Sequence, residues 1–193
     1  MPRALNLLIW IGALSVALVS YRVLIAPIDL VMQHMAHYAA SAPVAMWGHI
    51  LFGPLALAIV PFQFHAGLRR GRPALHRWMG RVYALSVAVA ALSSLALLPQ
   101  FQGQGWVGAG FGMLAILWIA TTALAVVAAR RRDFVQHRRW MLRSAALCFA
   151  AVSLRIIMAP LMAMGWSVVE TYQVTAWGSW LLTLGAVEWW MRR

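Results

Sequence analysis

His137-Arg138-Arg139-Trp140-Met141-Leu142-Arg143 has an earlier counterpart in His76-Arg77-Trp78-Met79-Gly80-Arg81. Aligned on Trp-Met, the two copies share Arg-Trp-Met-x-Arg and then Ala-Leu, at 84–85 and 146–147. A basic stretch precedes each copy, and an apolar run of about 20 residues follows, which is long enough to cross a bilayer. The repeat therefore indicates two membrane-spanning helices that begin on the same side of the membrane.

The whole chain has the composition of a membrane protein. Of its 193 residues, 63% are hydrophobic and 10% are charged, which leaves too few polar side chains to cover a water-soluble domain. We expect an all-α, polytopic transmembrane helix bundle of about six helices, forming a single integral membrane domain over residues 1–193. The apolar runs predict helices at about 4–23, 44–64, 76–98, 106–129, 137–164 and 172–190.

Positive charge is concentrated on one side of this expected bundle. The net charge is +12, and all sixteen Lys or Arg positions are arginine. If the chain crosses six times, every arginine except Arg22 and Arg155 falls on the side of the termini, which is the pattern of cytoplasmic loops. We therefore expect both termini in the cytoplasm, and this distribution argues against a nucleic-acid-binding role.

Residues 27–41 form the main external segment. Its apolar side chains fall on one helical face and its polar side chains on the other, which predicts a short amphipathic helix on the outer membrane surface. The alternative is a plug packed over the end of the bundle. The residues that set this pattern are Ile28, Val31, Met32 and Met35 on the apolar face and Asp29, Gln33 and His37 opposite.

The repeated motif also relates larger units. Helices 44–64 and 76–98 form one expected hairpin, and helices 106–129 and 137–164 form a second in the same orientation. This weak parallel repeat implies a pseudo-two-fold axis along the membrane normal.

Each motif places two arginines four residues apart around a tryptophan. The two sets are Arg77, Trp78 and Arg81, and Arg139, Trp140 and Arg143. One interpretation is anchoring to anionic lipid headgroups, with Arg81 and Arg143 stacked on the preceding tryptophan. The alternative is that both sets converge on one anionic group, such as a phosphate, a carboxylate or a haem propionate.

Histidine offers a second kind of site. His65, His76 and His137 lie at the expected inner surface, where they are candidates for binding a b-type haem that exchanges electrons with quinone. His49 and His65 lie sixteen positions apart on one helix. They are therefore about 160° apart around its axis, which disfavours the usual two-haem arrangement. Hydrogen bonding to backbone or headgroups is the ordinary alternative for each histidine.

Arg155 and His49 are the candidates within the membrane. Arg155 falls in the outer third of helix 137–164, where a charge is costly and often functional. We expect it to reach Glu170 or the carbonyls freed by Pro54, and it suggests a path through a small transporter. No catalytic motif is present, so no enzyme class is indicated.

These residues resemble an uncharacterised bacterial family of predicted membrane proteins, domain of unknown function 2306. The resemblance rests on the two His-Arg-Trp motifs and on His49-Ile50-x-x-Gly53-Pro54, Pro61-Phe62-Gln63-Phe64 and Ser153-Leu154-Arg155. It implies a bacterial inner-membrane protein and supplies no activity. From the residues themselves, we expect binding of an anionic lipid or amphiphile at a cytoplasmic Arg/Trp/His site, with a haem protein and a transporter as alternatives.

Overall fold

The computed structural model describes the backbone of residues 3–193 and the side chains from residue 6 onward. This part of the chain is helical throughout, without strands. Its elements are α1 (Arg3–Ser20), η1 (Tyr21–Leu24), α2 (Ile28–Val31), η2 (Gln33–Met35), α3 (His37–Ser41), α4 (Pro43–Phe64), α5 (Ala66–Gly71), α6 (Pro73–Leu97), η3 (Leu98–Gln100), α7 (Gly105–Arg130), α8 (Phe134–Cys148), α9 (Ala150–Ala163) and α10 (Val168–Met191). The predicted all-α class is confirmed.

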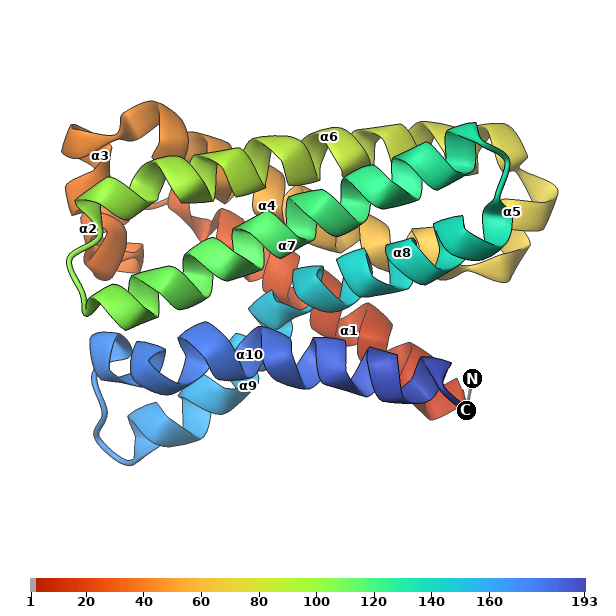
Figure 1. Ribbon diagram of the computed structural model, residues 1–193. Helices are drawn as coiled ribbons and strands as arrows, with labels where there is room; N and C mark the ends of the chain where they lie inside the picture. Colours follow the sequence, from red (N-terminus) through yellow and green to blue (C-terminus); the bar gives the residue numbers. More distant parts are fainter. Residues whose placement is uncertain (1–2) are drawn as a thin grey trace.

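The long helices run along a common direction between two ends of the bundle (Figure 1). One end holds α5, the turn at 131–133 and both chain termini, and we call it the basic end after its arginines. The opposite end holds α2, α3 and the turn that joins η3 to α7. Both repeated motifs therefore begin at the same end, as their sequences predict.

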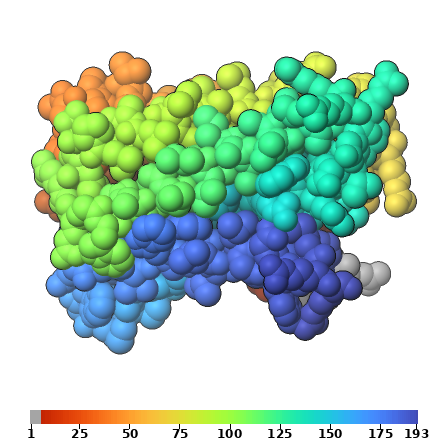
Figure 2. All heavy atoms as spheres, viewed as in Figure 1, coloured from red at the N-terminus to blue at the C-terminus, as the bar shows by residue number. Residues whose placement is uncertain are grey.

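Five segments of the described chain are long and apolar enough to cross a membrane, so this is a multi-pass membrane protein. They are Asn6–Leu24, Pro43–Phe64, Pro73–Gln100, Gly105–Arg130 and Phe134–Ala163. Large apolar side chains such as Leu18, Leu92 and Ile156 point outward from them, as expected beside lipid. The sixth predicted helix is present as α10, which forms a separate band along the bundle in Figure 2 but is not among these five segments.

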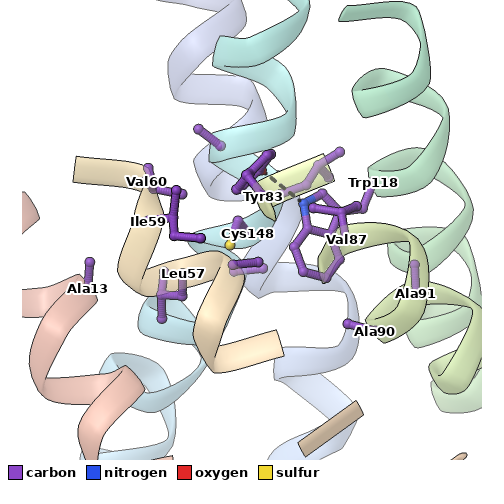
Figure 3. Close-up of a cluster of buried hydrophobic side chains, with 14 of the residues drawn as sticks. Ala13, Leu57, Ile59, Val60, Tyr83, Val87, Ala90, Ala91, Trp118 and Cys148 are labelled. Carbon is purple, nitrogen blue, oxygen red and sulfur yellow. Dashed lines mark hydrogen bonds between the residues drawn. The ribbon is translucent and has the colours of Figure 1, made fainter. Parts of the chain in front are cut away.

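The core lies where α4, α6, α7 and α8 meet, and it contains a polar network. Tyr83 and Ser144 are 1% and 0% exposed, and their hydroxyl oxygens lie 2.7 Å apart. Ser144 also shares a hydrogen bond of 2.7 Å with Thr122. The indole of Trp118 donates to the Tyr83 hydroxyl over 3.3 Å, as Figure 3 shows among the surrounding apolar side chains. Each hydroxyl of this network has a hydrogen-bond partner, as buried polar groups require. The network joins α6, α7 and α8.

The two predicted hairpins are both present. Helix α4 packs along α6, and α7 packs along α8. Each hairpin is tied near its His-Arg-Trp motif: Gln63 Nε2 donates to the His76 carbonyl (3.2 Å), and His137 Nδ1 donates to the Ala125 carbonyl (2.9 Å).

The predicted helix 137–164 is wrong in one respect, because the chain breaks at Phe149 into α8 and α9. Before the break the chain packs along α7 and α10; after it the chain leaves α7, stays along α10 and touches α1. The Ser153 hydroxyl holds α9 against α10 by donating to the Ser179 carbonyl (2.7 Å). The break therefore separates α9 from α7.

The single amphipathic helix predicted for residues 27–41 is also wrong. Met32 has φ −143° and ψ 49°, which interrupts the helix, and the segment forms α2, η2 and α3 instead. Met32 and Tyr38 are buried against Met46 and Ile50. The alternative of a packed plug is the arrangement found, and we call residues 27–41 the lid.

Candidate functional site

The two Arg/Trp motifs lie at the basic end on different helices. Arg77, Trp78 and Arg81 are exposed on α6, and Arg139 is exposed on α8. Helix α6 packs on α4 and α7, whereas α8 packs on α7 and α10. The structure thus places the two motifs on the same end without packing α6 extensively against α8.

Arg143 has a carboxylate partner within the chain. Its Nε and Nη2 atoms donate to Glu188 Oε1 and Oε2 over 2.5 and 3.0 Å, a bidentate ion pair. Its guanidinium also lies over the Trp140 ring, 4.6 Å from the centroid, as the sequence predicts. The i,i+4 spacing suggests Arg192 as the partner of Glu188, but Glu188 pairs with Arg143. Glu188 thus neutralises one arginine of the repeat.

A groove of about 460 Å³ lies beside this pair, between the start of α8 and the end of α10. Its wall is mostly apolar and freely accessible, since Phe134, Val135 and Trp190 are 67%, 66% and 53% exposed. Arg138 and Arg139 supply its positive charge, and no acidic residue of the described chain lines it. The groove therefore combines an apolar wall with cations that lack carboxylate partners in it.

The three histidines proposed as haem ligands each have different contacts. His65 caps α5, because its Nδ1 accepts from the Leu68 amide (3.1 Å), and its ring lies edge-on to Trp10. His137 is held against α7 through Ala125. The Nδ1 atom of His76 is buried without a partner in the described chain. Among the residues that the structure describes, no three His, Cys, Asp or Glu side chains lie together in a group that could hold a metal ion.

A second, larger cavity lies toward the opposite end, and we call it the chamber. Its volume is about 1,110 Å³, and α1, α4, α6, α7, α8, α9, α10 and the lid contribute to its wall. It extends from His34 and His37 in the lid to Trp118, midway along α7, and Cys148, the last residue of α8. The break at Phe149 explains this space, because it separates α9 from α7 on either side of it.

Arg155 and His49, the two candidates within the membrane, both line the chamber. Arg155 Nη1 donates to the Ala151 carbonyl (2.8 Å), and Nη2 donates to Ser20 Oγ (3.1 Å). These contacts differ from both expected partners. Glu170 forms a capping box with Ser167 instead.

His49 is held by one ring nitrogen. Its Nδ1 lies 2.7 Å from Ser94 Oγ and 3.3 Å from the Ala90 carbonyl. The described chain supplies no partner for Nε2. Because the half-buried ring lines the chamber, Nε2 is its remaining polar atom there.

The lid closes over the chamber through aromatic and polar contacts. Arg22 donates from Nε and Nη2 to the Val31 carbonyl (3.2 and 2.7 Å), and His37 Nε2 donates to the Gln100 carbonyl (3.2 Å). The His34 ring packs edge-on against Tyr172, with centroids 5.8 Å apart. Burial lowers the pKa of His34 below its ordinary value, and the charges of Arg22, His37 and Arg155 lower it further, which favours the neutral imidazole.

The sequence identifies Arg155 and His49 but misses the space and the hydroxyl groups around them. Ser20, Ser94 and Tyr172 come from three different helices, and each has an ordinary role in isolation. Ionisable side chains within apolar runs carry a signal that is visible in the sequence, and neutral hydroxyls do not.

Comparison with curated proteins and with solved structures finds no match to this chain. The sequence model of one family, described as predicted membrane protein (DUF2306), matches residues 46–191. The match covers most of the chain, including both Arg/Trp motifs and the groove. It also covers the chamber residues, except those of α1, η1 and the lid. The chain therefore belongs to the DUF2306 family of predicted membrane proteins.

Proposed function

We propose that this protein is a bacterial inner-membrane protein that binds an anionic phospholipid at the groove of the basic end. In this proposal α10 is a sixth crossing, and the basic end with both termini faces the cytoplasm. The concentration of arginine at this end supports that orientation. The anionic surface of the cytoplasmic leaflet then supplies the ligand.

The observation that carries the proposal is the composition of the groove. Phe134, Val135 and Trp190 offer exposed apolar surface to acyl chains, while Arg138 and Arg139 offer charge to a phosphate. Arginine binds phosphate oxygens through paired N–H groups, which makes it well suited to this ligand. The exposed Arg77, Trp78 and Arg81 extend the same chemistry on α6.

The proposal predicts that Arg138→Gln/Arg139→Gln lowers the amount of phosphatidylglycerol retained by the purified protein several-fold. The reason is that each arginine near an anionic surface contributes about 1 kcal/mol of attraction. Native mass spectrometry of the intact protein after mild delipidation measures the retained lipid. Arg130→Gln/Arg131→Gln is the matched control, because it removes the same charge from the same end but outside the groove.

Equal loss in both double variants would show a diffuse electrostatic effect and would contradict a specific site in the groove. The visible spectrum of the same samples tests the haem alternative. A Soret band that disappears in His76→Ala or His137→Ala would replace this proposal with a haem protein.

A further inference from the structure

Arg155 is a half-buried cation with unused hydrogen-bonding capacity. A guanidinium has five N–H donors, and the structure gives partners to two of its nitrogens, Nη1 and Nη2. Both acceptors are neutral. Within residues 6–193, the only ion pair joins Arg143 to Glu188. No carboxylate of these residues therefore pairs with Arg155. A charge in such surroundings is costly unless it is paired, and an anion in the chamber would pair it.

The charged side chains of the chamber are all positive. No acidic side chain of the described chain lines it, whereas Arg22 and Arg155 both do. Two nitrogens of Arg22 hold it to the Val31 carbonyl of the lid, and Arg155 makes no hydrogen bond to the lid. A carboxylate carries one negative charge, which would balance Arg155.

The part of the chamber away from the lid is lined by apolar side chains and therefore favours an apolar ligand. Leu57, Leu114, Trp118 and Leu147 line it near the middle of the bundle. The indole of Trp118 is already satisfied by Tyr83, so this side chain presents mainly its apolar ring surface. The volume of about 1,110 Å³ exceeds the usual range for pockets that hold drug-sized molecules, about 300–1,000 Å³.

We propose that the chamber binds a long-chain monocarboxylic acid, with its carboxylate on Arg155 and its hydrocarbon chain against Leu57, Trp118 and Leu147. Tyr172 and the free Nε2 of His49 are additional polar groups in the same chamber. This site is distinct from the phospholipid groove, because the two lie toward opposite ends of the bundle. Its ligand differs as well, in the charged group, a carboxylate in place of a phosphodiester, and in the number of acyl chains.

The test uses the full chain in nanodiscs and a photoreactive laurate that carries a diazirine at its methyl end. After illumination, mass spectrometry of peptides locates the label. We expect label on residues 114–118 and 147–151, and we expect excess laurate but not dodecanol to displace it. Arg155→Gln should weaken labelling about ten- to a hundredfold, the usual value of hydrogen bonds to a charged group. Arg138→Gln/Arg139→Gln should label as the unmodified protein does.

These variants separate the two proposed sites, because Arg155→Gln should retain phosphatidylglycerol while it loses chamber labelling. Label confined to lipid-facing surfaces would overturn the proposal, as would unchanged labelling of Arg155→Gln. If Arg155→Gln does not fold, competition between the photoreactive laurate and unlabelled molecules on the unmodified protein still tests the proposal. Equal displacement by dodecanol would remove the role of the carboxylate, and equal displacement by inorganic phosphate would identify a site for a simple anion instead.

Discussion

Gly110→Ala should lower the free energy of unfolding by about 1–3 kcal/mol, the usual cost of inserting a methyl group into a closely packed contact. A Cβ at this position would lie 2.9 Å from the Ala176 carbonyl oxygen and 2.8 Å from Trp177 Nε1. The carbonyl belongs to the α10 backbone, and the indole is held because it donates to the Trp106 carbonyl (2.9 Å). Because the backbone carbonyl cannot move without its helix, α10 must shift away from α7.

Gly185→Ala provides the matched control for this prediction. Gly185 lies on α10, and a Cβ there would meet nothing within 4 Å. Alanine favours a helix over glycine by about 0.5–1 kcal/mol, so this variant should be at least as stable as the original protein. Equilibrium unfolding in mixed micelles gives both values. Identical unfolding midpoints for the two variants would show that α10 does not lie against α7 at Gly110.

Glu188→Gln should destabilise the protein by about 1–3 kcal/mol, between the values for exposed and buried ion pairs. The side chains of Arg143 and Glu188 are 24% and 32% exposed, so solvent screens the pair only partly. Without the carboxylate, Arg143 keeps its position over Trp140 but loses its counter-charge. The contact between α8 and α10 is weakened as a result.

A double-mutant cycle isolates the energy of this pair. Unfolding of Arg143→Gln, Glu188→Gln and the double variant should show that the second substitution costs little once the first is made. Arg192→Gln distinguishes this pairing from the one that i,i+4 spacing suggests, because it should leave stability nearly unchanged. Additive effects of Arg143→Gln and Glu188→Gln would mean that the two residues do not interact.

Hydrophobic run length and arginine position predict the class of this protein and the arrangement of its long helices. Membrane-crossing length and the placement of loops depend on local composition, which the sequence displays directly. The helix breaks are harder to predict. Phe149 has neither proline nor glycine beside it, and the break there coincides with the point where the segment leaves α7. The Met32 interruption likewise accompanies burial of the lid.

The candidate sites are predicted only as single residues. Arg155 is recognisable because a charge within an apolar run is expensive wherever the fold places it. Its contact with Ser20, however, joins positions 135 residues apart, and the Arg143–Glu188 pair joins positions 45 apart. Spacing rules cover only neighbours on one helix, so they suggest Arg192 for Glu188. The chamber itself has no local signal, because its wall is assembled from seven long helices and the lid.

The break at Phe149 also makes the depth of the chamber adjustable. One segment of 30 residues packs on α10 along both of its halves, but on α7 only before the break. If the break moved one helical turn toward the C-terminus, the contact with α7 would lengthen by about 5.4 Å and reduce the depth of the chamber. A break one turn earlier would deepen the chamber by the same step. Chain-length selectivity would then be set by the point where a single segment leaves α7, with no change to the proposed carboxylate-binding Arg155.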